Sequence, residues 1–167
     1  MPNNTTTILT HEEIRHKIRR IAYQIYESNV NETELIIAGI ADNGFLFAQR
    51  LKKILEEISD LKITLCEVTM NKKAPQNTVQ TSLKPELYHN KSVVLIDDVL
   101  NSGTSLIHGV KHFLEVPLAR FKTAVLVNRN HKKYPIKADF KGISLSTSLH
   151  EHIEVYFGKE DYAQLEY

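Results

Sequence analysis

The sequence has little of what marks secreted and membrane-spanning proteins. Its one cysteine, Cys66, cannot form an internal disulfide bond, which fits a reducing compartment. No stretch is apolar for long enough to form a membrane-spanning helix, and the N-terminal MPNNTTTILT lacks the apolar core of a secretory signal. We therefore expect a cytoplasmic protein with no membrane partner.

The sequence also lacks an excess of charge of either sign. It carries 21 Lys and Arg against 20 Asp and Glu, a formal net charge of +1. This balance gives no overall attraction to nucleic acid or to a membrane surface, although a local basic patch is still allowed. With 42% hydrophobic and 25% charged residues, the 167 residues are expected to form a single globular domain over 1–167.

Apolar spacing along the chain predicts alternating helices and strands. The first helix has Thr10 and Glu13 at its start, in the spacing of a capping box. Residues 1–7 are expected to be a loose tail, and the polar residues 71–91, with two prolines, one long loop. The expected helices span 11–28, 45–58 and 104–116, and the expected strands 34–40, 61–70, 92–96, 121–128, 139–146 and 152–158. This alternation predicts an α/β fold, a mostly parallel sheet flanked by helices.

Two adjacent acids follow a buried strand in the stretch VVLIDDVLNSGTS, residues 93–105. Ligands of open α/β sheets bind at the carboxyl ends of the strands, where Asp97 and Asp98 are expected. Carboxylates accept hydrogen bonds from sugar hydroxyls and can also face Mg²⁺. The segment after them has no Lys or Arg, but its backbone N–H groups lead into a helix N-terminus, which can bind a phosphate without basic side chains.

These two halves together predict a site for a ribose 5-phosphate. The residues that would form it are Asp97, Asp98, Asn101, Ser102, Gly103, Thr104 and Ser105. The alternative is an ordinary strand–loop–helix junction with helix-capping residues, which a lone Gly-Thr-Ser would favour. Four apolar residues, two acids and Ser-Gly-Thr-Ser in one frame favour the ligand site.

The same stretch resembles the 5-phosphoribosyl-1-pyrophosphate motif of the type I phosphoribosyltransferases. Three further stretches, ILTHEEIRHKIRRIAYQI, LIIAGIADNG and AVLVNRNHKKYPIKADFKGISLSTS, resemble one branch, the pyrimidine-operon attenuation regulators, which are also uracil phosphoribosyltransferases. The similarity runs from about Ile8 to Phe157, and a more distant one extends to the hypoxanthine-guanine phosphoribosyltransferases. The resemblance implies a type I phosphoribosyltransferase fold, with a mostly parallel sheet, a flap and a small hood.

The resemblance also implies an activity. Ribose 5-phosphate would move from 5-phosphoribosyl-1-pyrophosphate to a nitrogen of a nucleobase, with release of pyrophosphate and with Mg²⁺ as cofactor. Asp97 and Asp98 would be the catalytic residues that hold the ribose hydroxyls, and Mg²⁺ would be bound mainly through the ligand, with these two acids as its candidate protein ligands. The chain would assemble as a homodimer or homotetramer.

Other site residues follow from the same resemblance. Residues 70–90 would be a mobile flap, which excludes water from the reaction when it closes. The pyrophosphate loop, which in the family often holds a non-proline cis peptide, would be Ile40, Ala41, Asp42, Asn43 and Gly44. The base pocket would be shaped by Asn128, Arg129, Ser146, Thr147, Ser148, Leu149 and His150.

The chain departs from this branch where the branch is basic. The branch has basic residues in its pyrophosphate loop, and an arginine in its phosphate loop where this chain has Thr104. Its flap carries an arginine, for which Lys72 or Lys73 would substitute here without the bidentate guanidinium. It also has an acid where this chain has Asn128. These changes predict weaker pyrophosphate handling.

Three interpretations stay open from the sequence. The chain is a phosphoribosyltransferase with shifted base specificity, for which uracil is favoured over a purine, or it is a slow one. Alternatively, it is a nucleotide-sensing, RNA-binding regulator of pyrimidine genes with little or no catalysis. RNA would contact two groups of basic residues, which otherwise read as solvated polar surface: Arg15, Lys17, Arg19 and Arg20, and His131, Lys132, Lys133 and Lys137.

Overall fold

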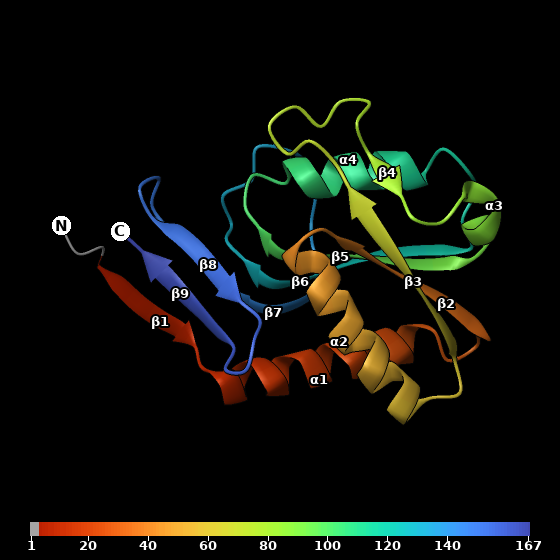
Figure 1. The fold of residues 1–167 in the computed structure, drawn as a ribbon, viewed down its shortest axis with the longest axis horizontal. Coiled ribbons are helices and arrows are strands. Elements are labelled where there is room, and N and C mark those ends of the chain that lie inside the picture. Colours follow the sequence, from red (N-terminus) through yellow and green to blue (C-terminus); the bar gives the residue numbers. More distant parts are fainter. Residues whose placement is uncertain (1–3) are drawn as a thin grey trace.

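The larger of two sheets forms the centre of the computed structural model, which describes residues 4–167 (Figure 1). Its strand order is β4-β3-β2-β5-β6-β7. The strands are β2 (Glu34–Ile40), β3 (Lys62–Thr69), β4 (Gln80–Thr81), β5 (Ser92–Leu100), β6 (Arg120–Asn128) and β7 (Phe140–Ser144). All neighbours in it are parallel except β3 and β4. The predicted α/β fold with a mostly parallel sheet is confirmed.

Helices cover both faces of this sheet (Figure 1). The helices α1 (His11–Ser28) and α2 (Asn43–Ile58) lie on one face, and α4 (Thr104–Phe113) and the short α3 (Pro85–Tyr88) lie on the other. Because successive side chains of a strand point to opposite faces, each central strand must be apolar on both sides. In β5, Val94 and Ile96 pack toward α1 and α2, while Val93 and Leu95 pack toward α4.

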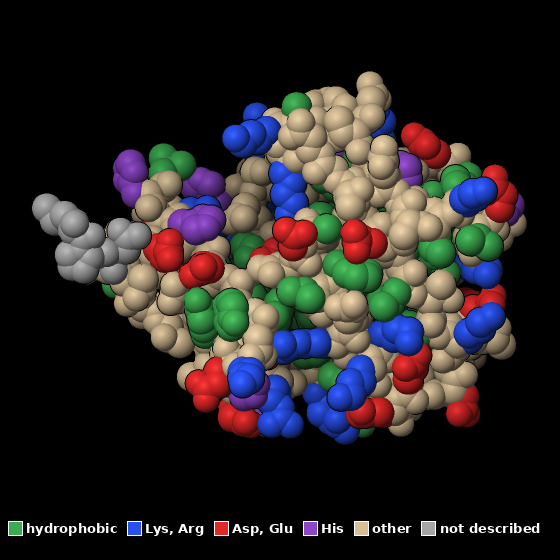
Figure 2. All heavy atoms as spheres, in the orientation of Figure 1, with side chains coloured by type: hydrophobic (Ala, Val, Ile, Leu, Met, Phe, Trp, Pro, Cys, Tyr) green, Lys and Arg blue, Asp and Glu red, His purple; other side chains and the backbone are tan. Residues whose placement is uncertain are grey.

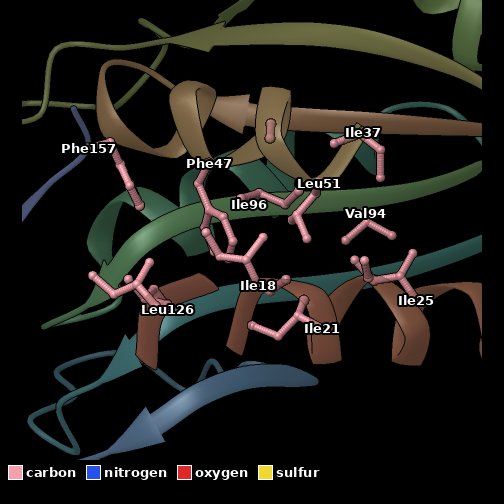
Figure 3. Close-up of a cluster of buried hydrophobic side chains, with 14 of the residues drawn as sticks. Ile18, Ile21, Ile25, Ile37, Phe47, Leu51, Val94, Ile96, Leu126 and Phe157 are labelled. Atoms are coloured by element: carbon pink, nitrogen blue, oxygen red, sulfur yellow. The ribbon is translucent and has the colours of Figure 1, made fainter. Parts of the chain in front are cut away.

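The helical spacing of α1 is what builds the first core (Figure 3). Its Ile18, Ile21 and Ile25 are at most 2% exposed and meet Phe47 and Leu51 of α2 over the sheet. Burying each such side chain contributes about 1.5–3 kcal/mol relative to leaving it in water. At the start of the helix the predicted capping box is present, with Glu13 N–H donating to Thr10 Oγ1 over 3.3 Å.

A second, three-stranded antiparallel sheet forms the small hood that the resemblance implied. Its strands β1 (Thr5–Leu9), β9 (Tyr162–Glu166) and β8 (His152–Tyr156) lie in the order β1-β9-β8, so the two ends of the chain are neighbours (Figure 1). The prediction of a loose tail over 1–7 is therefore wrong for the part within β1, while residues 1–3 lie outside the described residues. In β1 only Leu9 is buried, so its sequence carries no apolar alternation that would predict a strand.

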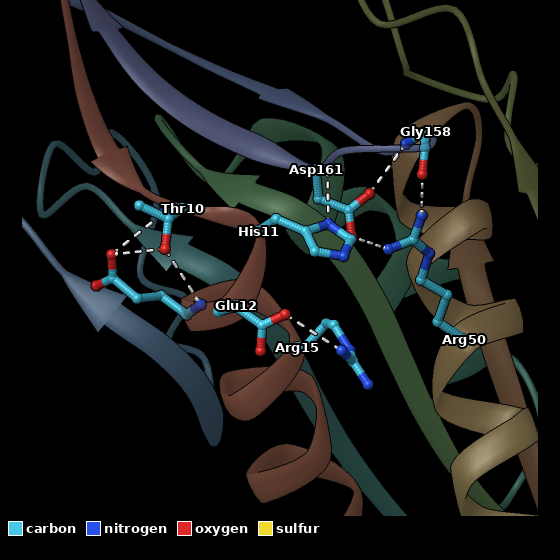
Figure 4. A network of polar contacts seen from close by, with 8 residues as sticks. Thr10, His11, Glu12, Arg15, Arg50, Gly158 and Asp161 are labelled. Carbon is cyan, nitrogen blue, oxygen red and sulfur yellow. Dashed lines mark hydrogen bonds and ion pairs between the residues drawn. The ribbon is translucent and has the colours of Figure 1, made fainter.

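A buried ion pair anchors the small sheet to the helices (Figure 4). The Asp161 side chain is fully buried and accepts hydrogen bonds from the Arg50 guanidinium and from Gly158 N–H, the latter over 2.9 Å. The backbone N–H of Asp161 donates to His11 Nδ1 over 2.9 Å. These contacts join the turn between β8 and β9 to the first residue of α1 and to the middle of α2.

Several further boundaries differ from the prediction. Residues 71–91 are not one loop, because they contain β4 and α3. The strand predicted over 92–96 continues to Leu100, since its backbone keeps pairing with β6 beyond the acids. Helix α4 ends at Phe113 instead of residue 116, and α2 begins at Asn43, two residues before the first apolar residue that marks it. Strand β9 was not predicted.

Candidate active site

The two acids of the motif lie near the carboxyl end of β5, inside the strand. Asp97 is 6% exposed, and its Oδ1 accepts a hydrogen bond from the Asp98 backbone N–H over 2.9 Å. Asp98 is half-buried, and its Oδ2 accepts a hydrogen bond from Asn43 Nδ2 over 3.1 Å. The prediction that the acids mark the ligand end of a parallel strand agrees with this geometry.

The surroundings of the two acids are unequal. Burial, and next to it the neighbouring Asp98 carboxylate, raises the pKa of Asp97 well above its usual range, while the Lys72 ammonium opposes this rise. A buried carboxyl beside a second carboxyl holds its proton more tightly, because two adjacent negative charges repel each other in a poorly solvated site. In the absence of a ligand, negative charge is therefore less favoured on Asp97.

The loop that follows β5 turns sharply into α4. Gly103 has φ +87°, a left-handed conformation that side chains rarely adopt, and a Cβ there would lie 2.4 Å from Ile136 Cγ2. Ser102 and Thr104 share a hydroxyl–hydroxyl hydrogen bond of 2.7 Å across this glycine. Thr104 N–H donates to Ser102 Oγ over 3.3 Å, and the next N–H groups of α4 lack helical partners by the geometry of any helix, so they are available to a phosphate.

Three residues that were not predicted for this role support the loop. The backbone N–H groups of Lys133 and Tyr134 donate to Ser102 O over 2.8 and 3.2 Å, and Ile136 packs under Gly103. No sequence pattern marks this role, because the hydrogen bonds use backbone atoms of a polar and basic stretch. The 131–136 segment thus fixes the shape of the predicted phosphate cradle.

The predicted pyrophosphate loop lies next to both acids. The peptide bond between Ala41 and Asp42 is cis, as the resemblance implied for this loop. Asn43 contacts Asp98, and Gly44 lies so close to β5 that a Cβ there would be 3.0 Å from the Asp97 Cα. The Ile40 side chain is fully buried in the core, whereas Asp42 is exposed.

A pocket of about 220 Å³ brings these parts together. Its walls include both acids, Lys72, Val125 and the whole loop from Asn101 to Ser105. Lys72 comes from the segment after β3, which was predicted as the flap, and its neighbour Lys73 does not line the pocket. Among the described residues, Lys72 is thus the one cation that lines the pocket, together with carboxylate, amide, hydroxyl and apolar side chains.

The predicted base-pocket residues gather around Arg129. Arg129 is 9% exposed. Its guanidinium donates hydrogen bonds to Thr147 Oγ1, Ser148 O and Glu151 O, and to Asn101 Oδ1 over 3.4 Å. The Asn128 amide is buried and donates to Ser144 Oγ over 3.4 Å. Leu149 is 78% exposed, and Ser146 and His150 are also exposed. None of these side chains lines the pocket of the acids, so their contact with a base stays a prediction.

A larger pocket of about 480 Å³ lies between α1 and α2, away from the acids. Its cations are partly neutralised, since Arg15 pairs with Glu12 over 3.2 Å and Arg50 pairs with Asp161. Figure 2 shows basic and acidic side chains interspersed over this part of the surface. The smaller pocket, which holds the acids and the phosphate loop, is therefore the better candidate for the chemistry.

The two basic groups considered for RNA come from different elements. Arg15, Lys17, Arg19 and Arg20 lie on α1, which packs on the α2 face of the sheet, while Tyr134 and Ile136, sequence neighbours of the second group, pack toward α4. Arg20 is also engaged, because its guanidinium donates to Lys141 O and Gly142 O over 2.7 and 2.8 Å. An RNA contact by these basic residues therefore stays a prediction.

Comparison with known proteins identifies the family of the chain. The family model of the phosphoribosyl transferase domain matches residues 4–159. The chain belongs to the phosphoribosyltransferase family. Among its relatives, the bifunctional protein PyrR of Streptococcus thermophilus is 35% identical over 153 residues, which cover 89% of this chain and 87% of the relative. The bifunctional protein PyrR of Brevibacillus brevis is 32% identical over 166 residues, which cover 95% and 93%.

Solved phosphoribosyltransferases share the fold. A hypoxanthine-guanine phosphoribosyltransferase from Bacillus anthracis superposes with a TM-score of 0.73 at 18% identity, over 90% of this chain and 87% of that one. The hypoxanthine phosphoribosyltransferase of Trypanosoma cruzi, in complex with the product IMP, gives 0.73 at 17% identity, over 86% and 81%. The type I phosphoribosyltransferase fold predicted from the motif is confirmed.

The side chains of this phosphoribosyltransferase offer few ligands to a metal ion. Within residues 4–167, no group of three or more His, Cys, Asp or Glu side chains could hold a metal ion. The acids at the end of β5 can supply carboxylate oxygens, which suit Mg²⁺. This donor set fits an ion that arrives with a phosphorylated ligand and takes most of its oxygens from it. In the same part of the chain, no helix has the length and apolar character to cross a membrane.

Proposed function

We propose that this phosphoribosyltransferase moves ribose 5-phosphate from 5-phosphoribosyl-1-pyrophosphate to uracil, with release of pyrophosphate and with Mg²⁺ as cofactor. The observation that carries the proposal is the single pocket in which Asp97, Asp98, Lys72 and residues 101–105 meet. Carboxylates for a ribose diol and N–H groups for a phosphate lie in it side by side, in the order in which the ligand carries those groups.

The residues of the chain act by orientation and charge. Asp97 and Asp98 would accept hydrogen bonds from the ribose hydroxyls, and the loop before α4 would hold the 5-phosphate. The bond from ribose C1 to pyrophosphate then breaks, with its electron pair leaving on the pyrophosphate. A nitrogen of the base forms the new bond to C1 and releases its proton to the pyrophosphate or to solvent. The carboxylates stabilise the positive charge that develops on the ribose as the leaving group departs. Bound Mg²⁺ would supply charge neutralisation on the pyrophosphate.

Lys72 supports the pyrophosphate half of the proposal. The resemblance left open whether Lys72 or Lys73 takes the place of the flap arginine, and Lys72 is the one that reaches the pocket. An ammonium there can attract the anionic ligand as a point charge, without the bidentate hydrogen bonds of a guanidinium. We infer that Lys72 contacts the ligand when the flap, residues 70–90, closes.

A second candidate function is a nucleotide-sensing, RNA-binding regulator with weak catalysis. Two observations favour it: the relatives are named bifunctional proteins, and the loop of Ala41, Asp42 and Asn43 offers no cation to pyrophosphate. A nucleotide product has no pyrophosphate. The missing cation in this loop would therefore reduce its binding affinity less than that of the phosphoribosyl donor. Such a protein would bind UMP or GMP well and turn over slowly.

One experiment separates the two functions. The protein is incubated with 5-phosphoribosyl-1-pyrophosphate, Mg²⁺ and, in turn, uracil, hypoxanthine, guanine, xanthine and adenine, and nucleotides are separated by chromatography. The enzyme predicts nucleotide formation, fastest with uracil. The regulator predicts no product with any base, together with UMP or GMP binding that tightens binding to an RNA leader.

The resemblance also supports two broader proposals. We propose that the chain forms a homodimer or homotetramer, which light scattering after size-exclusion chromatography measures directly. We also place it in the cytoplasm, where its one cysteine, the fully buried Cys66, would stay reduced.

A further inference from the structure

Asn43 makes two hydrogen bonds that connect three parts of the molecule. Its Nδ2 donates to Asp98 Oδ2 over 3.1 Å and to the backbone Val155 O over 2.8 Å. Asn43 is the first residue of α2, at the end of that helix that lies nearest the small sheet, to which Val155 in β8 belongs (Figure 1). One amide therefore joins the predicted pyrophosphate loop, a ribose-binding acid and the small sheet.

The chemistry of the partners fixes the orientation of the amide. A carboxylate oxygen and a carbonyl oxygen only accept hydrogen bonds, so the NH₂ group of Asn43 must face both of them. An amide nitrogen carries two hydrogens, and the two contacts use both. Within residues 4–167, this is also the one hydrogen bond from the protein to the Asp98 carboxylate.

Asn43 does not line the pocket that Asp98 lines. Its side chain therefore meets the Asp98 carboxylate from outside the residues that line the pocket. A half-buried carboxylate without a protein donor could adopt other rotamers or turn toward solvent. The hydrogen bond from Asn43 restricts these alternatives.

We propose that Asn43 is a positioning residue, which holds the Asp98 carboxylate toward the ribose hydroxyls and couples it to β8 of the small sheet. The inference rests on the proposed function, since it assumes that Asp98 binds the phosphoribosyl donor. It assigns Asn43 a role in the ribose half of the site, although its sequence position is in the pyrophosphate loop. Binding of the donor at Asp98 would then reduce the motion of β8.

Two substitutions separate this role from filling space. Asn43→Asp keeps the shape but cannot donate, and it places a second carboxylate against Asp98. Asn43→Ala removes both the shape and the donor. We expect both variants to weaken binding of 5-phosphoribosyl-1-pyrophosphate with Mg²⁺ by roughly tenfold to a hundredfold, the range for a hydrogen bond to a charged group. A space-filling role predicts that Asn43→Asp binds like the wild type.

Gln164→Ala is the matched control. Gln164 Nε2 also donates to a carboxylate, Glu154 Oε2, over 2.7 Å, and both residues lie on the small sheet away from the pocket. Its loss should leave donor affinity and turnover unchanged. In steady-state kinetics, the Asn43 variants should raise the KM of the phosphoribosyl donor and leave the KM of the base unaltered.

Hydrogen exchange tests the coupling to the small sheet. Titration calorimetry gives the donor affinity, and exchange of the amides of β8 is measured with and without the donor. We expect the donor to slow this exchange in the wild type but not in Asn43→Ala. Wild-type affinity and wild-type protection of β8 in both variants would overturn the inference alone. Failure of the wild type itself to bind the donor would overturn the proposed function, and this inference with it.

Discussion

At the scale of single residues, the two adjacent acids differ in burial and in their partners. Asp98 is half-buried and accepts a hydrogen bond from a neutral amide, so it is suited to exchange a water partner for a ribose hydroxyl. Asp97 is buried and has the Asp98 N–H as its partner. In the sequence the two aspartates look equivalent. Their difference in burial and in partners arises in the fold, where β5, α2 and the predicted flap meet.

Asp98→Asn tests the ribose assignment. The variant keeps the shape of the side chain but removes the charge that would stabilise the developing positive ribose. We expect turnover to fall by about a hundredfold, the usual loss for one electrostatic contact to a transition state. Steady-state rates with the donor and uracil measure it. A variant with wild-type kcat and wild-type donor KM would remove Asp98 from the site.

Asp97→Asn should stabilise the protein without ligand while weakening donor binding. The raised pKa of Asp97 means that the folded state keeps a proton that the unfolded chain releases. Stability from this group is therefore present at low pH and lost as pH rises from about 4 toward the folded-state pKa. At pH 7 the variant avoids this loss, and we expect a gain of about 0.5–2 kcal/mol.

Thermal unfolding at several pH values checks this prediction. The melting temperature of Asp97→Asn should exceed that of the wild type at pH 7, and the gap should shrink as pH falls toward 4. Each kcal/mol corresponds to roughly 2–4 °C for a protein of this size. A variant that is equally or less stable at pH 7 would contradict the electrostatic account of this acid.

At the scale of elements, the turn from β5 into α4 depends on Gly103. An alanine there would meet both the left-handed φ and the Ile136 methyl group. We expect Gly103→Ala to destabilise the fold by about 1–3 kcal/mol and to weaken binding of the 5-phosphate. Adding Ile136→Ala removes the steric clash but not the backbone strain, so stability should recover only in part. Denaturant unfolding measures both variants, and unchanged stability in Gly103→Ala would contradict this account of the turn.

The contact between the small sheet and α2 depends on a buried charge pair. Burial alone would raise the pKa of Asp161, but hydrogen bonds from Arg50 and from Gly158 N–H outweigh it and lower the pKa. Stability from this carboxylate is therefore present at neutral pH and lost as pH falls through the folded-state pKa, below the ordinary value near 4. The Arg50 side chain is 32% exposed, so we expect Asp161→Asn to cost about 2–3 kcal/mol, less than a fully buried pair.

The pH dependence of unfolding tests the pair. The difference in stability between the wild type and Asp161→Asn should be full at pH 7 and should narrow as pH falls below about 4, the ordinary pKa of an aspartate. Glu56→Gln is the control, because Glu56 forms an exposed pair with Lys52 on α2, and such pairs contribute at most about 0.5 kcal/mol. A difference that does not depend on pH would show that the carboxylate acts by packing alone.

An element could be predicted from the sequence where its own residues carry the pattern that marks it. The strand before Asp97, the helix with its Thr10 cap and the α4 turn at Gly103 are marked by local patterns of apolar, capping and turn residues. In β1 only Leu9 is buried, with Ile8 half-buried, and its partner β9 lies at the far end of the chain, so neither strand carries a clear local signal. The carboxyl-terminal end of β5 was missed because backbone pairing with β6 does not require apolar side chains.

At the scale of the whole molecule, the sequence predicted the family and the main motif better than the contacts between distant segments. The predicted ribose and phosphate residues lie in one motif, and in the structure they line one pocket. The choice of Lys72 over Lys73, the support of Ser102 by Lys133, and the link from Asn43 to Val155 all join distant segments. Such contacts depend on how the small sheet and the flap pack, which no single segment encodes.

The most direct test of the account is whether pyrophosphate and a nucleotide are formed together. The protein is mixed with 5-phosphoribosyl-1-pyrophosphate, Mg²⁺ and uracil, and phosphorus NMR follows the donor and both products. The account predicts that the donor disappears while UMP and pyrophosphate appear in equal amounts, and that omission of uracil stops the reaction. A donor that stays intact with uracil and with every purine base would contradict it.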